Sequence, residues 1–289
     1  MKKEKKKNRF STFLLLISLA IGLSLLLYPT VSDYWNSLVQ SRAVATYAEA
    51  VDQMDEEAYD AIIKSAQEYN RELLNHPWGY GLPKGLVKRY TKELAVDDSG
   101  IMGIVEIPSI GVNLPIYHGT GEDVLQVAIG HLNWSSLPVG GADTHCVISG
   151  HRGLPSAKLF TNVDQLREGD TFLLRVLNEI LTYEIDTIAV VEPEETTSLK
   201  IVQGKDLCTL VTCTPYGVNS HRLLITGHRV DTAQDAKSIR VITDAMLVEP
   251  LLVAPAIALP ILLIIVIVLL LPRKKKKQKE KEGKHFVEN

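Results

Sequence analysis

Cysteine is scarce in this chain of 289 residues, which holds three, at positions 146, 208 and 213. A disulfide framework would show more cysteines in an even number, so at least one thiol is free. The sequence also lacks Cys-x-x-Cys and His-x-x-x-His spacings, and no internal repeat is present. These absences argue against a disulfide scaffold, a structural zinc site and a repeat array.

Basic residues are scarce between the two ends of the chain. The first nine residues carry six Lys or Arg against one Glu, and the tail from Arg273 carries eight against three. The part between them holds 17 basic and 30 acidic residues, which gives it a net charge near −13. Phosphate binding needs a basic face, so this acidic middle argues against nucleic acid as a partner.

Each basic end lies next to an apolar run. Residues 10–28 contain no charge, and residues 251–271 are 21 residues with none. A membrane-spanning helix needs ~20 apolar residues, so we expect two spans, at 10–28 and 250–272. The alternative for the first run is a cleaved signal peptide, although Tyr28 to Ser32 offers no small-x-small cleavage site. Positively charged flanks stay inside the cell, which predicts cytoplasmic termini and an acidic middle on the outer side of the cell membrane.

Between the predicted spans, the period of the apolar residues changes once. From Ser32 to about Asn75 they recur three or four apart, which predicts a pair of amphipathic helices. Residues 75–93 are interrupted by Pro and Gly, which predicts an irregular loop. From Gly100 the period is two, as in β-strands. We expect strands at 101–107, 112–117, 144–149, 172–176, 181–191, 208–213 and 223–226, and short helical segments at 123–129 and 156–160. This pattern predicts a mainly β domain, either a barrel or a sandwich.

The predicted organisation runs in eight parts. They are a cytoplasmic basic segment (1–9), a transmembrane helix (10–28), an extracellular helical region (29–74), a loop (75–98), a β domain (99–231), a linker (232–249), a second transmembrane helix (250–272) and a cytoplasmic basic tail (273–289).

Candidate chemistry centres on Cys213, at the end of one predicted strand, and Arg222, at the start of the next. If the Pro-Gly turn between them places the two opposite each other, their Cβ atoms lie ~5 Å apart. A cation beside a thiol favours the thiolate, which is the nucleophilic form. A cysteine nucleophile usually works with a histidine. His151 follows a buried strand directly, but other histidines of the predicted outer part remain candidates: His76, His118, His131, His145, His221 and His228.

These residues resemble the sortases, membrane-bound cysteine transpeptidases of Gram-positive bacteria. The block Thr209-Leu210-Val211-Thr212-Cys213 matches the TLxTC signature of that family. Arg222 falls on the family arginine, and Gly150-His151-Arg152 falls on the family histidine. The run from Gly130 through Gly141, the Cys-Thr-Pro-Tyr-Gly-Val-Asn segment and the second predicted span are similar to class C, the pilin-polymerising branch.

The resemblance implies an eight-stranded sortase β-barrel with N-terminal helices and a lid loop, flanked by two transmembrane helices. It implies that Cys213 attacks the Thr–Gly bond of an LPXTG-like sorting signal, that His151 transfers protons and that Arg222 stabilises the intermediate. It extends, more loosely, to substrate contacts by Thr212 and Asn219. The implied partners are pilin subunits that bear such signals and an acceptor lysine, and no metal or organic cofactor is required. A sortase that attaches proteins to peptidoglycan precursor amines, or a non-enzymatic membrane scaffold, remains an alternative.

The resemblance also bears on the loop at 75–98. Class C enzymes carry a lid with an Asp-Pro-aromatic motif, and His76-Pro77-Trp78 matches it except that His replaces Asp. Trp78 is therefore either a packing residue or a plug over Cys213. A neutral His cannot form the ion pair that the Asp forms, so the lid would be held mainly by Trp78 and would respond to pH.

Cys146 and Cys208 stand at matching places, five residues before His151 and Cys213 respectively. If their strands are parallel neighbours in register, the two thiols approach each other. The alternative is two buried apolar thiols with no bond between them. Because side chains alternate along a strand, we expect Cys208 to face away from the side that carries Cys213.

Overall fold

A computed structural model describes residues 3–76, 82 and 84–232 of the chain. Helix α1 (Lys3–Asp52) begins in one compact unit, which includes its residues up to Leu27, and continues into a second unit that starts at Tyr28. Among the described residues, one helical stretch, Phe10–Asp52, is long and apolar enough to cross a membrane, with a mean hydropathy of 2.4 in its most apolar window. The predicted second span (250–272) and the tail (273–289) lie outside the described residues, as does all but the first residue of the predicted linker (232–249).

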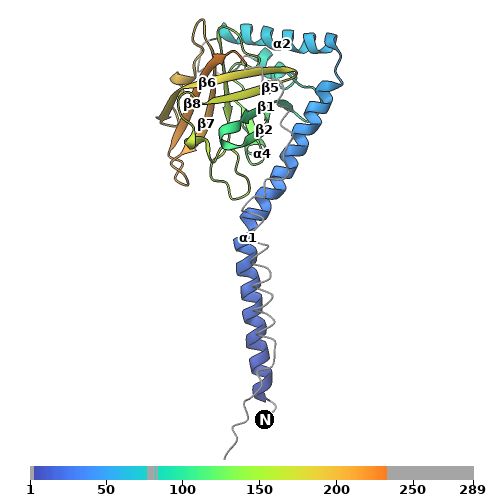
Figure 1. Ribbon diagram of the computed structural model, residues 1–289, viewed down its shortest axis with the longest axis vertical. Coiled ribbons are helices and arrows are strands. Elements are labelled where there is room, and N and C mark those ends of the chain that lie inside the picture. The colour runs from blue at the N-terminus through green and yellow to red at the C-terminus, as the bar shows by residue number, and fades with distance from the viewer. Residues whose placement is uncertain (1–2, 77–81, 83, 233–289) are drawn as a thin grey trace, which may run out of the picture. The chain divides into compact units, whose positions relative to one another are not determined.

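The second unit contains a closed barrel of eight strands, in the order β1-β2-β3-β4-β7-β8-β6-β5 (Figure 1). The strands are β1 (Ile101–Ile107), β2 (Val112–His118), β3 (Ile129–His131), β4 (Thr144–Ser149), β5 (Thr171–Val176), β6 (Glu179–Val191), β7 (Asp206–Thr214) and β8 (His221–Val230). Neighbouring strands are antiparallel except for the pairs β2–β3 and β4–β7, which are parallel. The prediction of an eight-stranded barrel is confirmed, and the barrel has no free edge strand.

Short helices occupy several of the connections between strands. They are α4 (Glu122–Leu125) and the 3-10 helices η1 (Pro108–Ile110), η2 (Val163–Gln165) and η3 (Thr197–Leu199). The predicted helix at 123–129 is therefore shorter than expected, because the chain leaves it to form β3, which the sequence did not predict. The predicted helical turn at 156–160 is wrong. There Leu159 has a φ of +37°, and the Phe160 N–H turns back to the His151 carbonyl instead of forming a helix.

Helix α2 (Glu56–Leu74) lies against the barrel with the amphipathic character that the sequence predicts. Asp55 caps it, since its side chain accepts a hydrogen bond from the Ala58 N–H. The buried Asn70 donates to the carbonyl of Leu137 and accepts from its N–H, as a neighbouring strand would. The Gly130–Gly141 run of the class C resemblance thus includes a docking point for α2.

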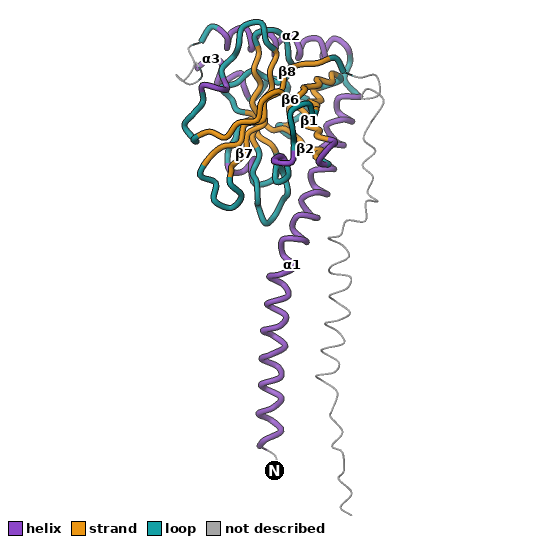
Figure 2. The backbone as a smooth tube through the Cα atoms, turned by 60° about the vertical axis from the view of Figure 1, so that its left-hand side comes forward, coloured by secondary structure: helices purple, strands orange, loops and turns teal. Residues whose placement is uncertain are grey.

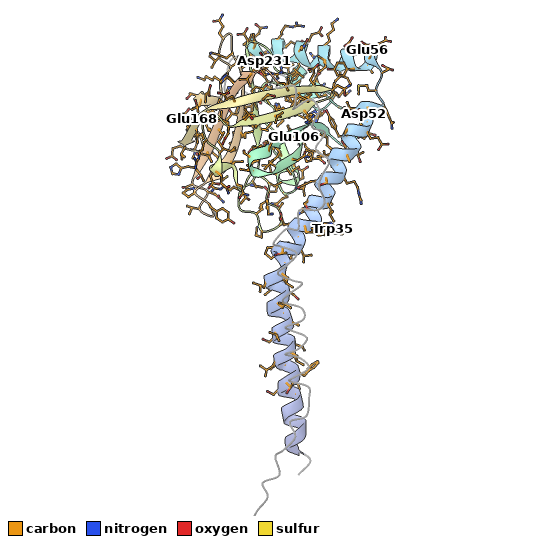
Figure 3. The ribbon with its side chains drawn as sticks, viewed as in Figure 1. Trp35, Asp52, Glu56, Glu106, Glu168 and Asp231 are labelled. Atoms are coloured by element: carbon orange, nitrogen blue, oxygen red, sulfur yellow. The ribbon has the colours of Figure 1, made fainter. Side chains whose placement is uncertain are left out.

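The end of α1 is also fixed to the barrel through a buried polar contact. The Tyr47 hydroxyl, 1% exposed, accepts a hydrogen bond from the Leu177 N–H at the β5–β6 turn. Burial raises the pKa of Tyr47 to about 12, so the hydroxyl stays neutral. In Figure 2 the strands form the centre of the second unit, and α2 and the later turns of α1 lie outside them. Asp52 and Glu56 lie close to the turn between the two helices (Figure 3).

The segment at 75–98, predicted to be irregular, includes helix α3 (Lys84–Tyr90). Leu86 and Tyr90 are four residues apart and both are buried, so this short helix presents one apolar face to the domain. The Tyr90 hydroxyl lies 3.0 Å from Nδ1 of the buried His131 on β3. The part of this segment that follows the expected lid motif is therefore packed on the barrel.

Candidate active site

The parallel pair β4–β7 places His151 and Cys213 at the same level. Ser149 pairs with Val211 at the last position of the ladder, and each candidate residue follows two positions later on its own chain. Cys213 still belongs to β7, whereas His151 begins the loop after β4. Adjacent strands lie ~4.8 Å apart, so two residues 62 positions apart in the sequence come to one end of the barrel.

Arg222 reaches the same place from the other side of Cys213. In the antiparallel pair β7–β8, Cys213 and Arg222 are direct cross-strand partners, as the turn between them predicts. The Arg222 Nη1 donates to the carbonyl oxygens of Asn219 at 3.3 Å and His221 at 3.1 Å. These two contacts hold the guanidinium over the start of β8. Cys213 therefore lies between the strand leading to His151 and the strand carrying Arg222.

The three residues line one groove with a volume of about 310 Å³. Its floor is a small apolar cluster on the outer side of the β4–β7–β8 sheet, separate from the barrel core. The cluster comprises Val147, Leu199, Val211 and Leu224, with Leu132, Trp134 and Val191 packed against it. A groove that has an apolar floor and is lined by a thiol, a histidine and an arginine suits a peptide with apolar side chains.

Close packing fixes the loop that carries His151. A Cβ on Gly150 would lie 2.5 Å from the Ile129 side chain and 2.8 Å from the Phe160 ring, so only glycine fits there. The Thr212 hydroxyl donates to the Gly150 carbonyl at 2.7 Å and ties β7 to this loop. The Nε2 atom of His151 is buried and has no hydrogen-bond partner among the described residues. Among the described residues, no structural partner therefore occupies this ring nitrogen.

Arg152 joins the His151 loop to the Cys213 segment. Its guanidinium forms an ion pair with Asp164 and lies 3.4 Å from the Thr214 hydroxyl, directly after Cys213. It also stacks over the Tyr216 ring, 5.8 Å from the ring centre. The side chain of Arg152 is only 9% exposed, so these contacts form a partly desolvated brace. The sequence did not assign this role, although Arg152 stands in the Gly-His-Arg block.

A series of polar contacts through His145 holds the wall of the groove that contains η3. One nitrogen of the buried His145 lies 2.9 Å from the Lys200 carbonyl, and the other lies 2.7 Å from the Thr209 hydroxyl. The hydroxyl of Thr209 in turn lies 2.8 Å from that of Thr226. Burial lowers the pKa of His145, which favours the neutral ring that such contacts require. Both threonines of the TLxTC block therefore hold the walls of the groove.

Cys146 and Cys208 are direct partners in the parallel β4–β7 ladder, so the condition under which the two thiols approach each other is met. Both are free thiols, and they are 2% and 0% exposed. Burial raises the pKa of Cys208 well above its ordinary value, so its thiol stays protonated. Cys208 is part of the barrel core, whereas Cys213 lines the outer groove. The two cysteines of β7 thus face opposite sides, as strand alternation predicts.

The other predicted site residues lie as follows. Thr212 lines the groove, and Asn219 lies in the β7–β8 turn with a φ of +60°. His76 is exposed just after α2, where its N–H donates to the Leu73 carbonyl. Pro77 and Trp78 lie outside the described residues. Within the part of the chain that the structure describes, no cluster of three or more potential metal ligands occurs.

Residues 105–230 match the sortase domain family. The fold is similar to sortase C1 of Streptococcus agalactiae, with a TM-score of 0.65 and 49% identity over 66% of this chain and 100% of that one. It is similar to Streptococcus pneumoniae sortase C, whose structure addresses pilin substrate specificity, with a TM-score of 0.60 and 41% identity over 66% of this chain and 97% of that one.

It is also similar to Clostridium perfringens sortase C, solved with the C-terminal cell wall sorting motif, with a TM-score of 0.59 and 41% identity over 66% of this chain and 100% of that one. The curated sortases that it matches are covered less fully, since the chain spans from 47% to 64% of their lengths. The fold, the family match and the high coverage of the solved class C enzymes agree with the geometry of the groove. The chain belongs to the sortase family of cysteine transpeptidases.

Proposed function

We propose that this chain is a membrane-anchored class C transpeptidase that cleaves an LPXTG-like sorting signal and joins the acyl fragment to a lysine of a pilin subunit. The observation that carries the proposal is the direct pairing of Cys213 with Arg222 at the end of an apolar groove that also holds His151. The scaffold alternative gives no reason for a thiol, an imidazole and a guanidinium to converge there. No metal or organic cofactor takes part in the proposed chemistry.

In the first half-reaction, the Cys213 thiolate attacks the carbonyl carbon of the threonine, and a carbon–sulfur bond forms. Negative charge moves to the carbonyl oxygen, where the Arg222 guanidinium stabilises it. His151, as the imidazolium, then donates a proton to the glycine nitrogen as the carbon–nitrogen bond breaks. The glycine-bearing fragment leaves with a neutral amine, and the threonine carbonyl remains as a thioester on Cys213.

In the second half-reaction, the lysine amine attacks the thioester carbonyl. His151, now neutral, accepts the proton that the amine loses, and Cys213 leaves as the thiolate. An isopeptide bond has formed, and the enzyme returns to its starting charges. His151 lines the groove and its Nε2 has no hydrogen-bond partner among the described residues, which supports this role because no structural hydrogen bond engages that nitrogen.

The choice of a pilin lysine as acceptor is supported by the class C neighbours, one of which has a structure that addresses pilin substrate specificity. Thr212 and Asn219 are proposed substrate contacts, at the groove wall and in the β7–β8 turn respectively. Transfer to a peptidoglycan precursor amine is the alternative outcome, and it would use the same thioester.

We further propose that His76, Pro77 and Trp78 form a lid whose indole covers Cys213. The lid is held mainly by Trp78, since His76 replaces the acidic residue of the class C motif. Trp78→Ala is expected to increase the rate at which a sorting peptide acylates Cys213. An unchanged rate of acylation would contradict the plug and favour a packing role for Trp78.

The proposed topology has two spans, with the barrel outside the cell and both termini in the cytoplasm. The apolar stretch of α1 that begins at Phe10 supports the first span. The charge runs of the sequence support the orientation, because basic flanks remain on the cytoplasmic side.

Acceptor competition tests the proposed function. The full chain in detergent is given a fluorescent LPXTG-like peptide together with equal amounts of a lysine-bearing pilin peptide and a cross-bridge amine. Mass spectrometry is expected to find mainly the isopeptide product, which Cys213→Ala abolishes. A product made only with the cross-bridge amine would contradict pilin polymerisation, and an absence of any cleavage would contradict the transpeptidase.

A further inference from the structure

The first turns of α1 in the barrel unit expose an apolar face. Val31 is 59% exposed, Tyr34 44%, Trp35 67% and Leu38 48%. Their spacing of three or four residues places them on one side of the helix. Figure 3 shows the labelled Trp35 pointing out from α1. A helix that presents this much aromatic and aliphatic surface has a contact that the described residues do not supply.

The opposite face of the same turns holds the loop that carries His151. Asp33 accepts a hydrogen bond from the Lys158 N–H at 2.8 Å, and Asn36 donates to the Ser156 carbonyl at 2.8 Å. The side chains of Lys158 and Asp33 also form an ion pair at 3.7 Å. Ser156 and Lys158 belong to the loop that the Phe160 N–H closes onto the His151 carbonyl. This short stretch of α1 therefore has an exposed apolar side and, opposite it, a polar side that is hydrogen-bonded to the loop that follows His151.

The apolar run before this stretch indicates where its exposed side lies relative to a bilayer. A hydrocarbon core of about 30 Å takes about 20 helical residues, which fits Phe10 to Pro29. Trp35 follows Pro29 by six residues, a helical rise of about 9 Å. Helical side chains lean toward the N-terminus, so its indole reaches back toward the lipid. Trp and Tyr prefer the headgroup level of a bilayer, where an apolar ring and a polar N–H or O–H are both accommodated.

We propose that Val31, Tyr34, Trp35 and Leu38 form a contact surface for the lipid headgroup layer on the outer side of the membrane. Through Asp33 and Asn36, this contact holds the Ser156–Lys158 loop, and with it His151, close to that surface. The proposal rests on the membrane anchor proposed above. It gives the exposed aromatic residues a role that the barrel alone does not explain.

Brominated lipids test this surface. The full chain is reconstituted into phosphatidylcholine vesicles that carry bromine either near the top of the acyl chains or near their ends, and the vesicles are floated on a density gradient. The Trp35 signal is the difference in tryptophan fluorescence between the native chain and Trp35→Phe. We expect bromine near the headgroups to quench this difference signal at least twofold more strongly than bromine at the chain ends.

Two results would overturn the surface alone: floated protein with an unquenched Trp35 signal, or stronger quenching by bromine at the chain ends. Failure to float would instead overturn the membrane anchor as well. A matched variant, Trp134→Phe, provides the reference for the groove tryptophan. Its difference signal is expected to be quenched less than that of Trp35.

Discussion

The two cysteines of β7 are five residues apart on one strand and have opposite environments. Cys208 is 0% exposed inside the barrel, beside Cys146, and burial raises its pKa well above the ordinary value. Cys213 is partly exposed, lines the groove and has Arg222 as its cross-strand partner. The residue type and the strand are the same, but the face of the sheet and the neighbouring charge differ.

This contrast shows that position along one strand, rather than residue type, sets the surroundings of each thiol in this fold. An odd separation along a strand turns the two side chains to opposite faces. Cys208 faces the apolar core, where burial raises its pKa, whereas Cys213 lines the outer groove opposite Arg222 on the next strand. Strands β4 and β7 therefore carry the buried Cys146–Cys208 pair at one level, and Cys213 and the loop of His151 follow at the end of the same two strands.

The largest expected effect on activity comes from replacing Cys213, and replacing Cys208 serves as its comparison. Cys213→Ala is expected to abolish the thioacyl-enzyme, because no other thiol faces the groove among the described residues. Cys208→Ala is expected to keep the activity and to lower the free energy of unfolding by about 1 kcal/mol through a small cavity. Peptide cleavage and thermal melting of both variants check this. Loss of cleavage in a well-folded Cys208→Ala would contradict the contrast.

The next effect concerns Arg222, the cross-strand partner of Cys213. Arg222→Ala is expected to lower kcat by about 10²–10³-fold, the usual cost of removing a donor to an oxyanion. Arg229 lies on the same strand, at the other end of β8, where it stacks over Tyr183. Arg229→Ala is therefore the matched control, with kcat expected to stay near that of the native chain. Equal losses of kcat would show that Arg222 acts only on the fold.

A smaller effect is expected from the two threonines of β7. Thr212→Val removes the bond to Gly150 and is expected to lower kcat about 10–100-fold, because His151 shifts relative to Cys213. Thr209→Val removes the bond to His145, which supports the wall near η3, and is expected mainly to raise KM. Steady-state kinetics with a sorting peptide measure both. The opposite assignment of kcat and KM effects would contradict the roles given to the two hydroxyls.

The smallest expected effect concerns the buried His145 and the way in which the stability of the fold depends on pH. Burial lowers the pKa of His145 below its ordinary 6.5, so the unfolded chain takes up a proton at a higher pH than the folded one. The stability from this residue is complete above about pH 6.5 and falls as the pH drops below it. His145→Gln should flatten the acid side of a plot of Tm against pH, where each kcal/mol corresponds to about 2–4 °C. An unchanged slope would contradict a neutral, buried His145.

The pattern of apolar residues predicted seven of the eight strands, whereas the closed barrel was expected from the resemblance to sortases. Strands at Ile101–Ile107 and Thr144–Ser149 have the predicted limits, since both are buried runs that end at turn residues. The three-residue β3 was missed because so short a strand has no period of its own and forms through pairing with β2 and β4. Helix α3 was missed because Pro and Gly precede it and only Leu86 and Tyr90 mark its face.

The site was predicted less evenly than the fold. The Cys213–Arg222 pair follows from one short turn, but the register of β4 with β7 brings His151 to them, and no local pattern reveals a parallel register. The contacts of Arg152 with Asp164 and Tyr216 could not be predicted either, because no local sequence pattern indicates them. They join residues far apart in the sequence that meet only after the barrel closes.

Cys213, and not Cys208 on the same strand, is expected to form the acyl bond with the sorting signal. The full chain is incubated with an LPXTG-like peptide that lacks an acceptor amine, quenched in acid, digested and mapped by mass spectrometry. We expect the peptide fragment up to threonine as a thioester on Cys213, with Cys146 and Cys208 unmodified. An acyl group on either of those thiols, or none on Cys213 while cleavage proceeds, would contradict this expectation.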